Sequence, residues 1–194
     1  MCLVEGTEIH ISTSQTKPIE DLLKYDPVLT MDGPFNVEES EGLMQVRSTT
    51  IANTLSSDDT LVDAYRFQAI GIFDINNGLL KSSADHMHIV KRDGQWRAVF
   101  AYQVKVGDYL YHITDGEIEI TSVVYDTTTV YTIYRLNIEP NDVFFANGIL
   151  THNAKGAGCD GIPPEQLCDP NDICYDPCNP EAWMCQPDCD FKPR

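Results

Sequence analysis

The sequence is poor in basic residues and has no long apolar run. Among its 194 residues, 13 Lys and Arg stand against 30 Asp and Glu, so the formal net charge is −17. Affinity for a phosphate backbone comes from Lys and Arg that displace counterions, and we therefore expect no nucleic-acid partner. No stretch approaches the roughly 18 apolar residues of a membrane span. We expect no membrane partner either.

The N-terminus lacks the features of a secretion signal. Its first residues, MCLVEGTEIH, have neither a basic start nor an apolar core. We therefore expect the chain to be cytoplasmic while it does its chemistry.

Cysteine is nearly absent from the first 158 residues, where Cys2 stands alone, and then becomes frequent. The end of the chain holds Cys159, Cys168, Cys174, Cys178, Cys185 and Cys189. From Ala154 onward the sequence is also rich in Pro and Asp, and the apolar periodicity of the body ends. These changes predict a domain over residues 2–153 and a Cys-rich tail over residues 154–194.

The tail has three readings. Six cysteines in a short segment allow fifteen disulfide pairings, and the even count favours disulfides. A metal site is less favoured because the tail contains no histidine and its cysteines are spaced more tightly than in common zinc ribbons. Unpaired thiols are the third alternative. We expect disulfides, and we expect no metal or cofactor in the protein.

The body has the pattern of an all-β domain. Its apolar segments are short, rich in Ile, Val, Tyr and Thr, and separated by turn signals such as Asn76-Asn77-Gly78, Arg92-Asp93-Gly94 and Asp115-Gly116. Only KPIEDLLKYD (17–26) suggests helix, and Pro18 before an acidic pair favours a single turn. Residues 31–63 are weakly patterned, and we expect a long loop or an irregular hairpin there. The strand-like segments are TEIHIST, RFQAIGIFDI, HMHIVKR, DYLYHIT, IEITSVVY, TVYTIYRLNI and DVFFANGILT.

Residues capable of chemistry occur in three places. Cys2 is the first residue of the domain, where a thiol reaches the preceding peptide bond; elsewhere a lone Cys is usually a small core residue. Ser83 and His86 lie three apart, so that a hydroxyl and an imidazole can converge on one backbone amide, although a hydrogen-bonded turn explains them equally well. His152 and Asn153, preceded by Asp142, end the last strand-like segment, where a plain turn is the simplest reading.

Taken together, these segments resemble the Hint domains, the fold shared by inteins, bacterial intein-like domains and hedgehog autoprocessing domains. CLVEGTEI with KPIEDLLKYDPVLTMDG resembles the N-terminal block, and SSADHMHIVKRDGQW with QVKVGDYL resembles the internal Thr-x-x-His block, with Ser83 in place of Thr. VYTIYRLNIEPNDVFFANGILTHN resembles the C-terminal blocks. The resemblance implies a horseshoe-shaped all-β domain of mini-intein size, with a small Cys-rich tail beyond it.

Three residues depart from the family pattern. Arg135 stands where many members carry Asp or Cys, and Asp142 stands where many carry His. Ala154 follows Asn153, where a splicing intein has Cys, Ser or Thr. Alanine has no nucleophile, so the usual branched intermediate cannot form there. This pattern resembles bacterial intein-like domains, which cleave more readily than they splice.

The resemblance implies a single-turnover, autocatalytic reaction whose partner is the chain's own flanking polypeptide, on the Met1 side and from Ala154 onward. At the first junction Cys2 attacks the carbonyl of residue 1 and forms a thioester. His86 protonates the departing amine, and Ser83 hydrogen-bonds the strained amide. If Met1 is the native start, only the C-terminal reaction matters; if a longer sequence precedes Cys2, both reactions remain open.

At the second junction Asn153 attacks its own backbone carbonyl, closes a succinimide and expels Ala154. His152 polarises that carbonyl or protonates the leaving amine, and Asp142 takes up the proton or orients the imidazole. Cleavage is the expected outcome, with protein splicing as a further one. Sterol transfer of the hedgehog type is disfavoured because it has no use for a terminal His-Asn.

The alternative is a catalytically inactive Hint fold that serves as a structural or display module for the tail. Cys2, His86, His152 and Asn153 together favour the self-processing reading, whereas Ala154 and Arg135 favour the inactive one. A disulfide-bonded tail conflicts with a reduced Cys2 unless processing takes place in the cytoplasm and the tail, secreted or surface-exposed, oxidises afterwards.

Overall fold

The computed structural model of the chain describes residues 1–32, 47–48, 51, 54–141 and 143–152. Asp142, Asn153 and residues 154–194 lie outside the described part. The domain boundary after Asn153 and the disulfides of the tail therefore remain predictions.

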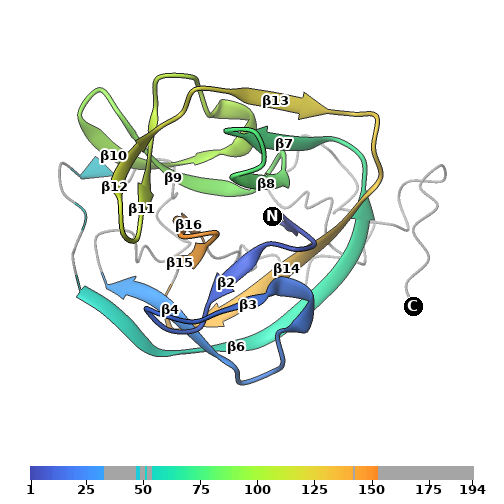
Figure 1. Cartoon of the computed structure of the whole chain (residues 1–194), viewed down its shortest axis with the longest axis vertical. Coiled ribbons are helices and arrows are strands. Elements are labelled where there is room, and N and C mark those ends of the chain that lie inside the picture. Colours follow the sequence, from blue (N-terminus) through green and yellow to red (C-terminus); the bar gives the residue numbers. More distant parts are fainter. Residues whose placement is uncertain (33–46, 49–50, 52–53, 142, 153–194) are drawn as a thin grey trace, which may run out of the picture.

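The described chain is built almost entirely of antiparallel strands arranged in two sheets, as Figure 1 shows. The prediction of an all-β body is confirmed. The first sheet has the order β13 (Val123–Asp126), β7 (Ile72–Ile75), β8 (Leu80–Ser83), β1 (Leu3–Val4), β14 (Tyr131–Glu139), β6 (Thr54–Ala69) and β4 (Pro27–Asp32). The second has the order β3 (Thr16–Pro18), β2 (Glu8–His10), β15 (Val143–Ala146), β16 (Ile149–His152), β11 (Tyr109–His112), β9 (Met87–Arg92), β10 (Gln95–Phe100) and β5 (Arg47–Ser48), with β12 (Gly116–Glu119) paired to β11.

The strands form where side chains alternate between core and surface. In β14, Tyr134, Leu136 and Ile138 are buried, while the residues between them are half-buried, which is the period of two of a strand with one covered face. The long curved strand β6 runs beside β14 and β4 along one side of the molecule (Figure 1). This pairing gives the first sheet its curl.

One sequence expectation is only partly right. Residues 31–63 were expected to form a long loop or an irregular hairpin, but β6 begins at Thr54 and pairs with β4 across the described part of this stretch. The described residues fit the irregular-hairpin alternative, with β5 of the second sheet between the two strands in sequence. Residues 33–46 lie outside the described part. The sequence of β6 gives no clear strand signal because most of its side chains are exposed or half-buried and many are polar. Its pairing is therefore carried by backbone hydrogen bonds rather than by an apolar pattern.

Three apolar segments that were expected as single strands are each divided. RFQAIGIFDI is divided between the end of β6 and β7. DVFFANGILT turns at Asn147 and Gly148, which have φ of 49° and 78°, and so forms the hairpin of β15 and β16. A Cβ on Gly148 would run into the ring of His112, so the close approach of β11 requires glycine there. IEITSVVY is divided between β12 and β13, which belong to different sheets.

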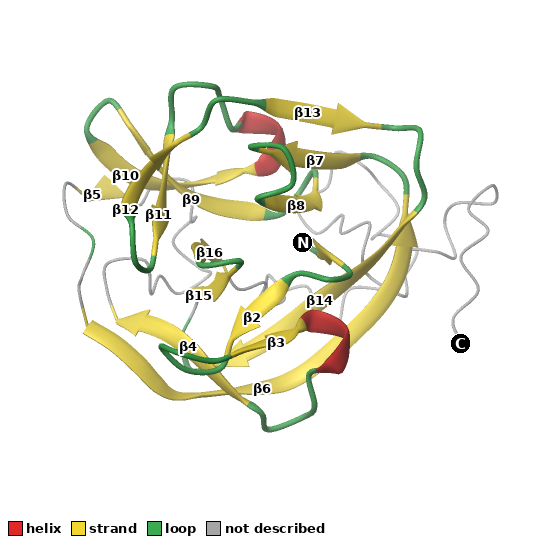
Figure 2. Ribbon diagram, viewed as in Figure 1, coloured by secondary structure: helices red, strands yellow, loops and turns green. Residues whose placement is uncertain are grey.

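In the described part of the chain, helix is confined to single turns. The described helices are two 3₁₀ turns, η1 (Ile19–Asp21) and η4 (Ala101–Gln103), and both lie at the periphery (red in Figure 2). The single turn predicted within residues 17–26 is confirmed by η1. No described helix has the length and apolarity needed to cross a membrane.

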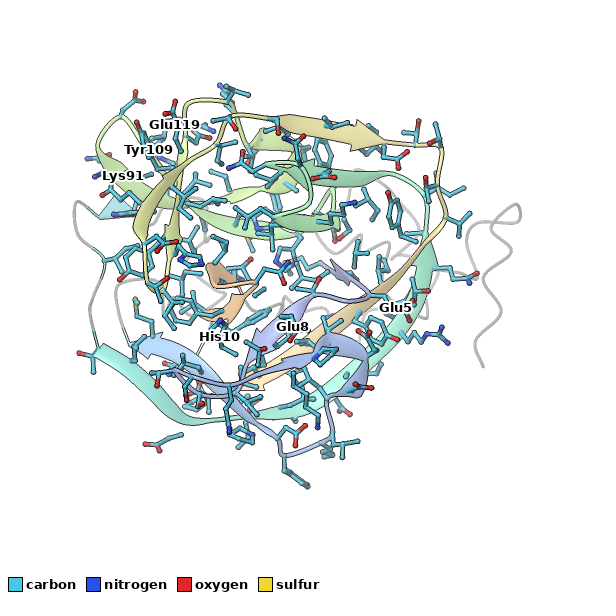
Figure 3. All side chains as sticks on the ribbon, viewed as in Figure 1. Glu5, Glu8, His10, Lys91, Tyr109 and Glu119 are labelled. Carbon is cyan, nitrogen blue, oxygen red and sulfur yellow. The ribbon has the colours of Figure 1, made fainter. Side chains whose placement is uncertain are left out.

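The surface near β9, β11 and β12 carries polar cross-strand pairs. Tyr109 lies opposite both Lys91 and Glu119 in the strand registers, and all three gather at one end of the molecule in Figure 3. This face is separate from the N-terminus in Figure 1, so Lys91 provides a control position for substitutions at the site.

The core brings the two described ends of the domain to the middle of the molecule (Figure 1). Strand β1 lies between β8 and β14, so Leu3 faces both Ser82 and Tyr134 in register. Strand β16 pairs with β9, where Thr151 lies opposite His88. The residues just before the first strand and those ending the last one therefore meet the same internal segment, β8 to β9.

Candidate functional site

The structure holds the backbone of Cys2 on both sides through Ser83. The Cys2 N–H donates to Ser83 Oγ at 2.8 Å, and the Ser83 N–H donates to the Cys2 carbonyl at 2.9 Å. Cys2 and Ser83 are both buried. The amide that joins Met1 to Cys2 is thus fixed in a water-poor position, with a hydroxyl at its nitrogen.

The reactivity of Cys2 depends on its oxidation state. Cys2 is disulfide-bonded in this structure. Only a thiolate is an effective nucleophile, so any attack by this sulfur requires its reduction first.

His86 lies in the turn between β8 and β9, and its backbone N–H donates to the Ser83 carbonyl at 3.1 Å. Its ring is buried, and Nε2 lies 2.8 Å from Thr151 Oγ1. Burial lowers the pKa of His86 well below its ordinary value, and repulsion from His88, the Met1 ammonium and His152 lowers it further. The resting imidazole is therefore neutral at neutral pH.

A second buried imidazole, His88, was missed by the sequence reasoning. Its Nδ1 lies 3.1 Å from Thr151 Oγ1 and its Nε2 lies 2.8 Å from Ser82 Oγ. The rings of His86 and His88 are 4.8 Å apart, centre to centre. Burial lowers the pKa of His88 to about 3. The signal in the sequence was the spacing His-x-His, since side chains two apart in extended chain point to the same side; His86 directly precedes β9 and His88 lies within it.

The C-terminal strand delivers His152 to the same interior. His152 is buried at the end of β16. It shares with His86 and Met1 the wall of a cavity of about 10 Å³, close to the minimum that holds one water. The full lining comprises Met1, Leu3, His86, Tyr134, Leu136, Phe144 and His152. The cavity is therefore lined both by Met1, at the first junction, and by His152, one residue before the predicted second junction.

The two remaining predicted site residues, Asp142 and Asn153, lie outside the described residues, but the residue before Asp142 is firmly held. The Asn141 N–H donates to Asp59 Oδ2 at 2.7 Å, and Asn141 Nδ2 donates to Asp59 Oδ1 at 2.9 Å and to Thr30 Oγ1 at 3.1 Å. All three residues are buried. A carboxylate on β6 thus pins the chain one residue before Asp142.

Sequence reasoning also missed Asp85. It forms an ion pair with the Met1 ammonium. Burial raises the pKa of Asp85, but the Met1 ammonium together with hydrogen bonds from Ser83 and from the Asp85 backbone outweighs it, so the net pKa is lowered. The negatively charged Asp85 carboxylate therefore lies beside the first junction, through its ion pair with Met1. In the sequence it stands between Ser83 and His86.

The described residues contain no group of three or more His, Cys, Asp or Glu side chains arranged to hold a metal ion. What they do bring together is the backbone of Cys2 with the Ser83 hydroxyl, and three buried imidazoles nearby. The Cys2 side chain itself packs with Val4, Ile72 and Ile133. Hydroxyls, thiols and imidazoles are groups suited to acyl transfer and proton transfer.

No family model matches the sequence, and no curated protein matches it. Solved structures do match. The bacterial intein-like domain from Clostridium thermocellum is 19% identical with a TM-score of 0.57, over 78% of this chain and 98% of that one. The chain has the Hint fold. A DnaB intein from Synechocystis aligns with a TM-score of 0.55 at 15% identity, over 79% of this chain and 99% of that one.

A third Hint structure, the AceL NrdHF class 3 split intein in a splice-inactive variant, has a TM-score of 0.57 at 15% identity, over 79% of this chain and 99% of that one. The predicted Hint fold is confirmed by these alignments. At such identities the likeness concerns the fold alone. The roles of individual residues must be argued from the geometry.

Proposed function

We propose that this Hint domain is a single-turnover self-processing domain that breaks peptide bonds at its own two ends. The observation that carries the proposal is the set of contacts around the first junction, the bond between Met1 and Cys2. Ser83 Oγ accepts from the N–H of the Met1–Cys2 amide, and the Ser83 N–H donates to the carbonyl of the next peptide bond, so both flank Cys2. The buried His86 and His152 line one cavity with Met1. The fold shared with inteins supports the same reading at a coarser level.

The first step is an N–S acyl shift at Cys2. The Cys2 sulfur, once reduced, attacks the carbonyl carbon of Met1, the amide C–N bond breaks, and the Cys2 nitrogen gains a proton. The product is a thioester between Met1 and the Cys2 side chain. Ser83 Oγ fixes the orientation of the nitrogen, and His86 delivers the proton. Because burial keeps the resting His86 neutral, its ring has a nitrogen that can accept the thiol proton before passing it on.

The second step is cyclisation of Asn153. Its side-chain nitrogen attacks its own carbonyl carbon, the bond to Ala154 breaks, and the Ala154 nitrogen gains a proton. His152 polarises the carbonyl or protonates the leaving amine, with Asp142 orienting the ring. Cyclisation expels whatever amine follows, so Ala154 prevents the usual splicing route without preventing cleavage.

The reaction partner is the chain's own flanking polypeptide, and the site needs a reducing compartment. Because Cys2 must be a thiol, we expect processing in the cytoplasm, before the tail forms its disulfides outside.

The first step is tested with the full chain carrying a short peptide ahead of Met1. A phosphine reductant is present in all samples, so that Cys2 is reduced throughout, and a small thiol is added to half of them. The thiol should release the peptide by intercepting the thioester. Cys2→Ala should abolish the release, and His86→Ala should slow it by about 10²–10⁴-fold. Lys91→Gln, on the far face, serves as the control and should release the peptide at the wild-type rate.

The alternative reading, an inactive Hint fold that displays the Cys-rich tail, rests on Ala154 and on Arg135, which occupies β14 opposite Tyr65. It predicts no thiol-dependent release and no cleavage after Asn153. Release that is equal in Cys2→Ala and in the unsubstituted chain would also favour it.

A further inference from the structure

The hydroxyl of Thr151 lies between the two buried imidazoles. Thr151 Oγ1 is 2.8 Å from His86 Nε2, 3.1 Å from His88 Nδ1 and 3.2 Å from the Met87 carbonyl oxygen. Thr151 is fully buried, so water does not supply alternative partners. The hydrogen-bond pattern must therefore be satisfied by these groups.

The number of protons available fixes this pattern. A threonine hydroxyl has one proton to donate and two lone pairs that accept. The Met87 carbonyl only accepts, so the Thr151 proton goes to it. Both imidazole nitrogens then have to donate to Thr151. No other assignment satisfies all three contacts when the rings are neutral.

The same reasoning extends to Ser82. With its proton on Nδ1, a neutral His88 has a lone pair on Nε2. That lone pair accepts the Ser82 hydroxyl proton across 2.8 Å. Burial keeps His88 neutral, with a pKa of about 3. The His88 Nδ1–H therefore donates to one lone pair of Thr151 Oγ1, and the other lone pair accepts from His86 Nε2–H.

For His86 the consequence is a single tautomer. The proton sits on Nε2 and the lone pair sits on Nδ1. Nδ1 is buried and has no hydrogen-bond partner among the described residues. It is the nitrogen left available for exchange, on a ring that lines the cavity with Met1.

We propose that Thr151, supported by His88 and Ser82, is a positioning residue that locks His86 as the Nε2–H tautomer, so that Nδ1 carries the proton transfer at the Cys2 junction. This rests on the proposed function. The Cys2 thiol gives its proton to His86 Nδ1 as sulfur bonds to the Met1 carbonyl carbon. Nδ1 then gives that proton to the Cys2 nitrogen as the C–N bond breaks. The ring returns to its starting tautomer.

The arrangement also ties the two ends of the domain together. Thr151 precedes His152 on β16, the strand that leads to the second junction, yet its hydroxyl holds the histidine of the first. Displacement of β16 would therefore disturb the first step as well as the second.

The tautomer is measured by long-range ¹H–¹⁵N NMR of the reduced full chain, with Cys2→Ala and Asn153→Ala added to keep it intact. We expect the His86 ring to show a protonated Nε2 and a bare Nδ1 at neutral pH. A protonated Nδ1 in this chain overturns the proposal, and this result does not depend on the folding of any Thr151 variant.

The functional arm compares Thr151→Val, which keeps the shape but removes the hydroxyl, with Thr151→Ser, which restores it. In the thiol-release assay Thr151→Val should be slower by about 10²-fold, the loss typical of a misplaced catalytic group, and its His86 ring should show mixed tautomers. Thr151→Ser should recover most of the rate and the single tautomer. If Thr151→Val releases the peptide at the wild-type rate while His86→Ala is inactive, the inference about Thr151 is wrong and the proposed function stands. Wild-type release in His86→Ala would sink the proposed function itself.

Discussion

Acidification should destabilise the fold through His88 in a way that can be calculated. The pKa of His88 is about 3 in the folded chain, because it is buried, whereas an unfolded histidine has a pKa of about 6.5. Between these values the unfolded chain binds a proton that the folded chain does not, so the free energy of unfolding falls as pH falls. The loss begins near pH 6.5 and is complete near pH 3.

The size of the loss follows from 1.36 kcal/mol per pH unit and bound proton. From pH 7 to pH 5, His88 alone should cost about 2 kcal/mol of unfolding free energy. His86, whose pKa is also lowered by burial, contributes a loss of the same sign. His88→Gln keeps a donor and an acceptor but cannot be protonated in this range. It should therefore lose about 2 kcal/mol less than the wild type over the same interval.

Urea unfolding at pH 7 and at pH 5, in the Asn153→Ala background and in a reducing buffer, measures the difference. Lys91→Gln is the matched control, since it introduces the same residue on the same strand without removing an imidazole, and it should show the wild-type loss. Equal losses in His88→Gln and the wild type would mean that His88 is not held neutral, and the tautomer argument for Thr151 would lose its basis.

Three further substitutions test other parts of the structure. Ser83→Ala should slow thiol-dependent release by about 10–100-fold by loosening the scissile amide, and Ser83→Thr should restore it; equal rates in both would remove Ser83 from the mechanism. Asp59→Ala leaves the buried Asn141 N–H and Nδ2 without their carboxylate acceptor, so it should lower the urea-derived free energy of unfolding by about 1–3 kcal/mol for each donor. No loss would show that Asp59 does not hold the chain before Asp142. Gly148→Ala should be destabilised by more than the roughly 1–2 kcal/mol of a left-handed backbone, because its Cβ meets His112, whereas Gly94→Ala has open space; equal melting temperatures would contradict the close contact.

Local patterns in the sequence predicted many of the strands of the body and the single turn at η1, and the resemblance to Hint domains implied the hydroxyl beside the Cys2 amide. Each depends on neighbours close in the chain or on a motif of fixed spacing, such as Ser83 and His86. Only the end of β6, in the segment RFQAIGIFDI, was expected as a strand, because its mostly polar, exposed or half-buried residues before Arg66 give no alternating pattern and its order comes from pairing with β14 and β4.

The missed parts of the site depend on contacts between residues far apart in the chain. His88 meets Thr151 only because β9 and β16 pair, 63 residues apart in sequence. The hold of Asp59 on Asn141 spans 82 residues. Such contacts follow from sheet topology, which no local spacing contains. The motif interpretation thus singled out Cys2, Ser83 and His86 but not Ser82, His88 and Thr151, which contact one another and His86.

The central claim, that the chain cuts itself, is tested most directly by intact mass spectrometry of the freshly purified, reduced chain over days at neutral pH. We expect it to divide into residues 1–153, lighter by one water than a hydrolytic product because of the succinimide, and the 41-residue fragment that begins at Ala154. Asn153→Ala should stay whole, and His152→Ala should divide about 10²–10⁴-fold more slowly. A chain that stays intact in both wild type and Asn153→Ala, or that divides equally in both, would contradict the account.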